Sequence, residues 1–379
     1  MSTTPEDLFV LRSERVMLPG GWAPAEVACS AGRITSIDPI GTHDDVVNLG
    51  AMALAPGYVD VQINGGYGHD FTASPKTIWE VGARLPATGV TAFVPTIITG
   101  PKETARAALA AARAAPKDYL GSSVLGLHFE GPVLSPQNPG AHDPAYLSTD
   151  VPLDVWLDPL ARIVTMATEL VEPTVISDLA AHGVVVALGH TNGTFEDANS
   201  AFDAGARHVT HLFNAMPPIR HRSPGPIVAA LLNSSVTVGV IPDGIHVHAG
   251  VLELVSRSVG PGRLIALTDA IAAMGMPPGD YRVGPLTAYS DGVSMKLPDG
   301  TYAGSILTMD RAVRFLIGEV GLTPFEAIAS ASTTPAALLG DESRGSIRPG
   351  ARADLVVLDS DYHVDTTLIG GTIVHGGPA

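Results

Sequence analysis

Residues 124–132 read VLGLHFEGP, a short aliphatic run that ends in a carboxylate followed by glycine and proline. Two later segments repeat the arrangement with histidine: residues 184–193 read VVVALGHTNG, and residues 207–217 read RHVTHLFNAMP. Short β-branched and aliphatic runs closed by Gly, Asn or Pro are typical of buried parallel strands and the loops after them. The three segments therefore predict strands that present Glu130, His190 and His211 at their ends.

The middle of the chain alternates strand-like and helix-like segments. Strands are expected at residues 58–63, 91–96, 124–129, 162–167, 184–188, 208–212, 236–241 and 264–268. Helical patterns lie between most of them; one covers residues 102–114, and another opens with Thr194 as its N-cap. This alternation predicts a (β/α)8 TIM-like barrel. The alternative, an open doubly wound sheet, would normally carry a glycine-rich dinucleotide loop after its first strand, and residues 64–68 do not match that pattern.

Both ends of the chain contain short β-like segments separated by glycine and proline, at residues 8–54 and 353–375. They predict a small β-sandwich domain formed by both termini; the alternative is two unrelated edge extensions of the barrel. The expected division is residues 1–55 and 344–379 for the small domain and residues 56–343 for the barrel.

Composition limits the classes of partner. The 379-residue chain is 45% hydrophobic and 16% charged, with a net charge of −16. This balance argues against nucleic acid and anionic membranes, which require basic patches. No apolar stretch has the length of a membrane span, the acidic N-terminus lacks a secretory-signal pattern, and the single cysteine, Cys29, excludes a cysteine-based metal site. We expect a cytoplasmic protein that acts on a small molecule.

Polar residues gather at the predicted strand ends, which converge at one mouth of a barrel. Glu130, His190 and His211 could form a three-ligand zinc-type site with a position left open for water. A structural site would usually be closed by a fourth protein ligand, so the pattern favours catalysis. Asp269 follows the last strand and is expected at the same mouth.

Seven segments in a fixed order carry a resemblance to a known family. They are PGYVDVQING (56–65), GLHFEGP (126–132), GHT (189–191), THLFNAMP (210–217), DGIH (243–246), TDA (268–270) and AGS (303–305). Over nearly its whole length the chain resembles the amidohydrolase superfamily and, within it, the N-acetylglucosamine-6-phosphate deacetylases. The resemblance implies a hydrolase that removes the acetyl group from N-acetyl-D-glucosamine 6-phosphate, leaving D-glucosamine 6-phosphate and acetate.

The same resemblance implies that Glu130, His190 and His211 hold one divalent metal ion. Carboxylate and imidazole ligands suit Zn²⁺, with Fe²⁺, Co²⁺ or Mn²⁺ as alternatives. The superfamily usually has His-x-His after the first strand, where this chain has Gln62 and Asn64, and amides are poor zinc ligands. Residues 165–169 also lack a lysine that could be carboxylated to bridge two metals. Both departures argue for one ion.

The family's catalytic groups match Asp269 and His142. Asp269 would act as general base and then general acid toward a metal-activated water and the departing amine. His142 would donate a hydrogen bond to the carbonyl oxygen as charge develops there.

The resemblance also implies a set of sugar-phosphate contacts and a homodimer. An arginine at the position of Arg222 can reach the neighbouring subunit's site in the family, and its guanidinium suits phosphate oxygens; Arg220 is a substitute if the alignment slips. The matching substrate-binding positions are Ala141, His142, Asn214, Ala215, Arg222, Asp243, Gly244, Ile245, His246, Tyr302, Ala303 and Gly304.

Two other functions are consistent with the residues. One is a different amidohydrolase, such as a D-aminoacylase or a cyclic-amide hydrolase, for which Arg222 would have no phosphate to bind. The other is a non-catalytic scaffold with the same fold, which Gln62 and Asn64 suggest. The retention of four residues opposes it: Glu130, His190, His211 and Asp269.

Overall fold

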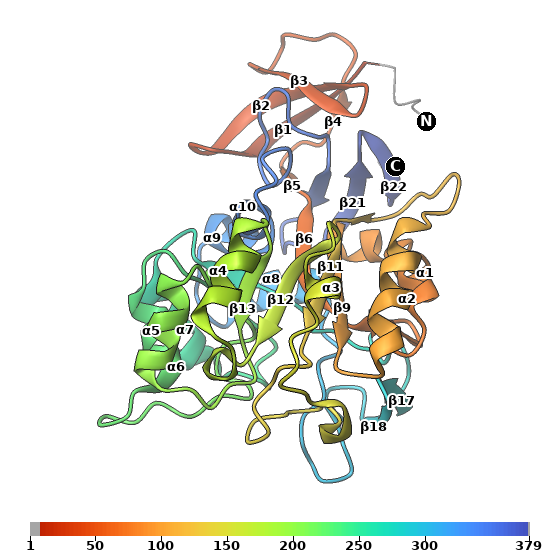
Figure 1. Cartoon of the computed structure of the whole chain (residues 1–379). Helices are drawn as coiled ribbons and strands as arrows, with labels where there is room; N and C mark the ends of the chain where they lie inside the picture. Colours follow the sequence, from red (N-terminus) through yellow and green to blue (C-terminus); the bar gives the residue numbers. More distant parts are fainter. Residues whose placement is uncertain (1–7, 378–379) are drawn as a thin grey trace.

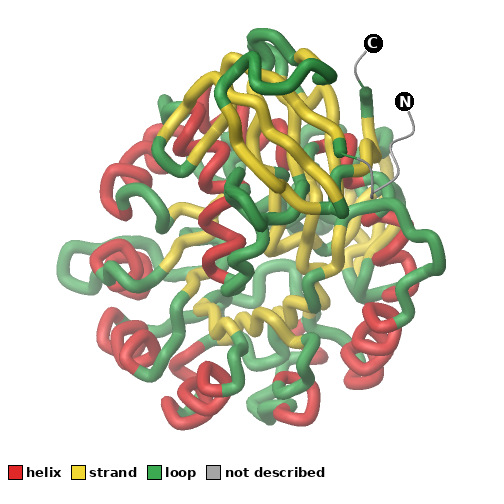
Figure 2. The backbone as a smooth tube through the Cα atoms, turned by 90° about the horizontal axis from the view of Figure 1, so that it is seen from above, coloured by secondary structure: helices red, strands yellow, loops and turns green. Residues whose placement is uncertain are grey.

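The computed structural model describes residues 8–377, and its largest part is a nearly closed barrel of eight parallel strands. The barrel strands in these residues are β6 (Tyr58–Ile63), β9 (Val90–Ile98), β10 with β11 (Ser123–Val124, Leu127–Glu130), β12 (Ala161–Met166), β13 (Val185–Leu188), β14 (His208–Val209), β15 (Thr237–Val240) and β16 (Leu264–Ala266). Figure 2 shows these strands as an inner ring with helices around it. The predicted barrel is confirmed, and the open doubly wound sheet is excluded.

The barrel strands are buried on both faces, as covered parallel strands require. Every residue of β6, β9, β11 and β13 is buried. Ile63 at the end of the first strand forms an isolated parallel bridge with Ala270, which follows the last strand, and this bridge joins the two edges of the barrel. Asn64 N–H donates to the Ala270 carbonyl (2.7 Å), and Asp269 N–H donates to the Gln62 carbonyl (2.8 Å). Residues from the two ends of the barrel therefore stand side by side at this seam.

Helices pack outside the ring. They are α1 (Ile78–Gly82), α2 (Lys102–Arg113), α3 (Leu153–Trp156), α4 (Pro173–Ala181), α5 (Phe195–Asp203), α6 (Gly225–Leu232), α7 (Ala249–Val259), α8 (Met309–Gly318), α9 (Pro324–Ala331) and α10 (Thr333–Leu338), with short 3₁₀ helices at Pro75–Thr77, Leu85–Thr88, Pro144–Tyr146 and Thr168–Leu170. Thr194 is the N-cap of α5 as predicted: its hydroxyl accepts from Asp197 N–H, and the Asp197 carboxylate accepts from Thr194 N–H. None of the helices in the described part of the chain has the length and apolarity needed to cross a membrane.

The two ends of the chain form one small β domain, which lies at the top of Figure 1 in red and blue. Its eight strands share one hydrogen-bonded sheet: β1 (Phe9–Leu18), β2 (Gly21–Ser30), β3 (Arg33–Asp38), β4 (Val47–Asn48), β5 (Ala53–Pro56), β20 (Leu355–Leu358), β21 (Val364–Ile369) and β22 (Thr372–His375). Antiparallel pairing of β5 with β20 joins the two termini, so they are not unrelated extensions. The domain has an apolar core of its own that includes Leu11, Val27 and Leu355.

At the mouth of the barrel, several strands end earlier than the sequence predicted. Strand β14 ends at Val209 rather than at residue 212, and β16 ends at Ala266 rather than at residue 268. The backbone leaves the ladder early because His211 and Asp269 adopt left-handed φ angles of 30° and 49°, which extended strands cannot contain. These turns direct the side chains toward the mouth.

A second difference is an insertion between β16 and α8 that sequence analysis did not anticipate. It forms a three-stranded antiparallel sheet of β17 (Gly279–Val283), β18 (Leu286–Ser290) and β19 (Met295–Lys296). Figure 1 shows β17 and β18 at the end opposite the terminal domain. A smaller hairpin, β7 (Gly65–Gly66) with β8 (His69–Asp70), follows β6.

Candidate active site

A carboxylate and two imidazoles meet at the mouth of the barrel. Glu130 is the last residue of β11, and His190 and His211 each lie two residues beyond their strands. Glu130 Oε1 lies 3.1 Å from His190 Nε2 and 3.0 Å from His211 Nε2, and the two Nε2 atoms are 3.1 Å apart. The three residues are 5% exposed or less. The three predicted ligands are therefore brought together around one point.

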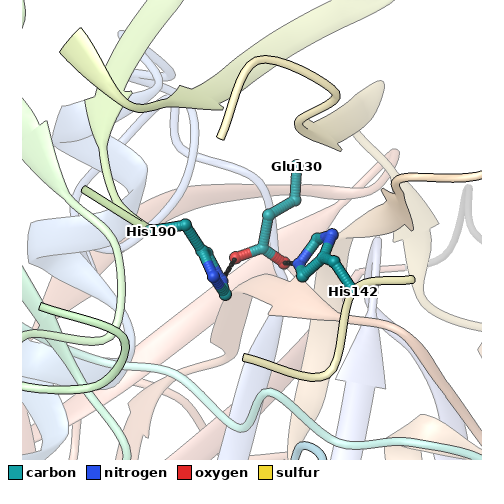
Figure 3. Close-up of side chains that lie close together, drawn as sticks. All are labelled: Glu130, His142 and His190. Atoms are coloured by element: carbon teal, nitrogen blue, oxygen red, sulfur yellow. Dashed lines mark hydrogen bonds and ion pairs between the residues drawn. The ribbon is translucent and has the colours of Figure 1, made fainter. Parts of the chain in front are cut away.

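Two sets of three groups lie close enough to share a cation: Glu130 and His190 with either His142 or His211. Figure 3 shows His142 and His190 on opposite sides of the Glu130 carboxylate. His142 Nε2 is 3.9 Å from Glu130 Oε2, whereas His211 Nε2 is 3.0 Å from Glu130 Oε1 and 3.1 Å from His190 Nε2. The shorter distances favour His211 as the third ligand and leave His142 beside the cluster.

The donor set fits one divalent cation. His190 Nδ1 lies 3.1 Å from the Asn138 carbonyl oxygen, which can only accept, so Nδ1 carries the proton and Nε2 presents a lone pair to the cluster. A carboxylate and two imidazole nitrogens within 3.1 Å of one another match the ligand types and number of a catalytic zinc site. The pocket adjoining them leaves room for a further ligand.

The charges at this cluster support the same assignment. Burial by itself would raise the pKa of Glu130, but the neighbouring imidazoles of His190 and His211 hold that pKa well below its usual value. The pKa of His211 is raised, because the hydrogen bond and charge of Glu130 outweigh burial, which lowers it. Glu130 is thus a buried anion that needs positive charge beside it.

Asp269 lies across the barrel seam and is linked to the cluster by two amides. Asn64 Nδ2 donates to Asp269 Oδ1 (2.7 Å), and Gln62 Nε2 donates to the same oxygen (3.2 Å) and to both oxygens of Glu130 (3.3 Å each). Of the two ends of the Gln62 amide, only the NH₂ group can donate hydrogen bonds to carboxylate oxygens. Burial, opposed by the charge of His211, raises the pKa of Asp269 to about 6. Gln62 and Asn64 therefore act here as donors to the carboxylates.

Backbone strain is concentrated at these residues. His190, His211 and Asp269 have φ angles of 48°, 30° and 49°, and Ala215 beside them has 52°. Left-handed conformations cost non-glycine residues free energy and persist only where the surroundings impose them. At Asp269 the carbonyl accepts from Ser305 N–H (2.9 Å), which helps to fix the turn.

His142 is oriented by hydrogen bonds between its Nδ1 atom and Thr99, the residue after β9. Thr99 N–H points at His142 Nδ1 (3.3 Å), and the Thr99 hydroxyl lies 2.9 Å from the same atom. A backbone N–H can only donate, so Nδ1 accepts and the ring proton resides on Nε2, on the side of Glu130. Burial lowers the pKa of His142 to about 3, so the ring is neutral. His142 can thus donate a hydrogen bond toward the mouth.

A pocket of about 430 Å³ opens above the cluster. The predicted site residues that line it are Glu130, Ala141, His142, His190, His211, Asn214, Ala215, His246, Asp269, Tyr302 and Gly304. His246 is oriented by Asp243, whose Oδ2 lies 2.6 Å from its Nδ1, and its ring faces Tyr302 at 5.6 Å between centroids. One pocket therefore contains most of the predicted residues.

Five predicted residues do not line this pocket: Arg222, Asp243, Gly244, Ile245 and Ala303. Asp243 acts through His246, and Ala303 is fully buried beside Gly304. Arg222 is exposed on the loop before α6, as is Arg220. Among the described residues that line the pocket there is no lysine or arginine.

Sequence reasoning did not identify Thr99 or the pocket residues Gln137 and Asn138. Thr99 could have been found, since it is a polar residue that follows the second barrel strand, where the same positional rule applies. Asn138 gave no such signal, because its role depends on how residues 135–142 fold back onto His190.

Comparison with known proteins supports this description. The model of the amidohydrolase family matches residues 53–374. N-acetylglucosamine-6-phosphate deacetylase of Bos taurus is 38% identical over 353 residues, which cover 87% of this chain and 85% of that protein. N-acetylgalactosamine-6-phosphate deacetylase of Escherichia coli O157:H7 is 35% identical over 377 residues, 96% of this chain and 98% of the other.

Solved structures agree with these relatives. N-acetyl-D-glucosamine-6-phosphate deacetylase of Mycobacterium smegmatis has a TM-score of 0.90 and 34% identity, with 97% of this chain and 100% of that chain covered. A mutant of that enzyme in complex with N-acetyl-D-glucosamine-6-phosphate has a TM-score of 0.91. The chain therefore belongs to the amidohydrolase family, within the branch of the N-acetylhexosamine-6-phosphate deacetylases, and is a hydrolase.

Proposed function

We propose that this protein hydrolyses the acetamide of N-acetyl-D-glucosamine 6-phosphate to D-glucosamine 6-phosphate and acetate, with one divalent metal ion per subunit. The observation that carries the proposal is the meeting of Glu130, His190 and His211 within 3.1 Å, with Asp269 linked to them through Gln62. The deacetylase names of relatives with 35–38% identity supply the substrate class.

Glu130, His190 and His211 would hold the ion, and Zn²⁺ is the ion that this mixed donor set suits best. When bound, a divalent ion polarises a carbonyl and lowers the pKa of water toward about 7. Fe²⁺, Co²⁺ and Mn²⁺ bind similar donors and remain alternatives.

Asp269 is the proton carrier in this proposal. It takes a proton from the attacking water and passes it to the amide nitrogen, which is a poor leaving group until it is protonated. The C–N bond breaks, the nitrogen leaves as the amine of the sugar, and the water oxygen remains in acetate. Donation by Asn64 and Gln62 keeps one Asp269 oxygen occupied and orients the other.

His142 would bind the carbonyl oxygen of the acetamide. Its Nε2 carries the proton, because Nδ1 faces the N–H of Thr99. A hydrogen-bond donor placed where negative charge develops lowers the barrier by roughly 3–4 kcal/mol.

In residues 8–377, no lysine or arginine lines the pocket that would receive the phosphate of the substrate. We therefore propose a homodimer in which Arg222, exposed on its own subunit, reaches the neighbouring pocket. His246 and Tyr302 line the same pocket and would contact the sugar phosphate.

The test is a coupled assay of acetate release with N-acetylglucosamine 6-phosphate, N-acetylgalactosamine 6-phosphate and free N-acetylglucosamine, combined with elemental analysis. We expect one equivalent of metal, loss of activity with a chelator, recovery with Zn²⁺, and preference for the first substrate. His211→Ala should abolish metal binding and activity, whereas His248→Ala, at an exposed helix N-cap outside the pocket, should preserve both. Metal-free wild-type protein with full activity would refute the proposal.

A further inference from the structure

We infer that Asn138 is a positioning residue for the metal ligand His190, and that it sets the affinity of the site for its ion. The inference rests on the metal site proposed above. Asn138 lies in the segment of residues 135–142 that covers one side of the pocket and ends with His142. Four separate contacts connect this segment to His190 and Thr191.

The first contact fixes the state of the imidazole. The Asn138 carbonyl oxygen lies 3.1 Å from His190 Nδ1 and must accept its proton. The lone pair of His190 is thereby confined to Nε2, the atom 3.1 Å from Glu130 Oε1. Groups that accept the second N–H of a metal-ligating histidine fix its tautomer and raise its basicity.

Two further contacts hold the carbonyl of Asn138 in place. Its side-chain Nδ2 donates to the Thr191 carbonyl (2.9 Å) and lies 3.3 Å from Asn192 Oδ1. Ser135 N–H donates to the His190 carbonyl (2.8 Å). The segment therefore contacts His190 on both its backbone and its ring, and it supports a residue whose φ of 48° is unfavourable.

The last contact is steric. Gly140 lies against the imidazole, and a Cβ atom at this position would be 2.9 Å from His190 Cε1. Gly140 also has a φ of 57°, so glycine suits both the turn and the close approach. The ring is thus enclosed between Asn138 and Gly140 on the side away from the cluster.

His211 has no equivalent support. Its Nδ1 is buried without a hydrogen-bond partner in the described part of the chain. Within residues 8–377, His190 is thus the one of these two histidines whose Nδ1 donates a hydrogen bond to a neighbouring loop. Loss of the Asn138 side chain should therefore act on His190 and through it on the ion.

The experiment measures Zn²⁺ affinity by competition with a chromophoric chelator in Asn138→Ala and Asn138→Leu, the second of which keeps the side-chain volume. The matched control is Gln137→Ala: Gln137 is the preceding residue and lines the same pocket, but its side chain accepts a hydrogen bond from Ser135 Oγ of its own segment (2.8 Å) rather than contacting residues 190–192. Unfolding temperatures of the metal-free proteins and the visible spectra of the Co²⁺ forms are recorded in parallel.

Both Asn138 variants should bind Zn²⁺ about 10-fold or more weakly, the range found when such supporting groups are removed. Their Co²⁺ spectra should shift, and their metal-free unfolding temperatures should stay close to that of the wild type. Gln137→Ala should bind Zn²⁺ within about twofold of the wild type.

Wild-type affinity and an unshifted Co²⁺ spectrum in Asn138→Ala would overturn this inference alone. An equal loss in Gln137→Ala would also overturn it, since the effect would then belong to the loop in general. Wild-type protein that binds no divalent ion would overturn the metal site itself, and this inference with it.

Discussion

The deep end of the pocket and the exposed loop that carries Arg222 are built differently. At the deep end, Glu130, His190, His211 and Asp269 are 9% exposed or less, and partners from the same chain orient them. By contrast, Arg222 is exposed on the loop before α6 and does not line the pocket. One chain therefore brings the proposed catalytic groups together in its own pocket, whereas the arginine proposed to bind the phosphate lies outside the lining of that pocket.

The largest effect should come from the deep end. Asp269→Asn keeps the size of the side chain but removes the proton carrier, so kcat should fall by about 10²- to 10⁴-fold. Metal content should stay at one equivalent, because Asp269 is not among the three proposed ligands. Stopped assays of acetate release with elemental analysis measure both quantities. Wild-type turnover in this variant would show that the proton takes another route.

A substitution on the loop that carries Arg222 should change KM for the substrate instead of kcat. Arg222→Ala removes a charged hydrogen-bond donor, so KM for the phosphorylated sugar should rise roughly 10- to 100-fold with little change in kcat. KM for free N-acetylglucosamine, which carries no phosphate, should not change. Arg220→Ala, an exposed arginine of the same loop, is the control. If Arg220→Ala gives the larger effect, the phosphate contact belongs to Arg220.

A smaller fall in kcat should follow when the orientation of His142 is weakened but its own hydrogen-bond donor is kept. Thr99→Val removes the hydroxyl that lies 2.9 Å from His142 Nδ1 but leaves the backbone donor in place. We expect kcat to fall about 10-fold at constant KM, below the 10²- to 10³-fold loss typical of a missing oxyanion donor. Thr99→Ser should restore most of the activity. Equal losses in both variants would point to packing rather than to the hydrogen bond.

The smallest expected effect is on the pH dependence of the free energy of unfolding. It arises from Asp60, at the seam between the first and last barrel strands. Asp60 accepts from Thr268 Oγ1 (2.5 Å) inside the barrel, and burial raises its pKa to about 7. The folded state therefore binds one more proton than the unfolded state between about pH 4 and pH 7, and stability should fall as pH rises through that window.

Asp60→Asn should flatten this dependence by up to about 1.4 kcal/mol per pH unit, measured by urea unfolding from pH 4.5 to pH 8. Asp45→Asn, at an exposed carboxylate, is the control. An unchanged slope in Asp60→Asn would mean that Asp60 does not titrate in this range.

The barrel and the terminal domain could be predicted from the sequence alone, and so could the convergence of the three residues proposed as metal ligands. Apolar runs of strand length that end in Glu130, His190 and His211 can be recognised without coordinates, because parallel strands carry functional side chains at their carboxyl ends. The same rule predicted that Asp269 lies at the mouth, and it could have predicted the same for Thr99.

Only the tertiary structure decided which groups support these residues. The contact between Asn138 and His190 joins positions 52 residues apart, and the amides of Gln62 and Asn64 reach Asp269 across the barrel seam. Hydrogen bonds of this kind depend on how separate loops close over the mouth and on left-handed turns at three non-glycine residues. Local sequence patterns record strand and helix periods, and they carry no information about such distances.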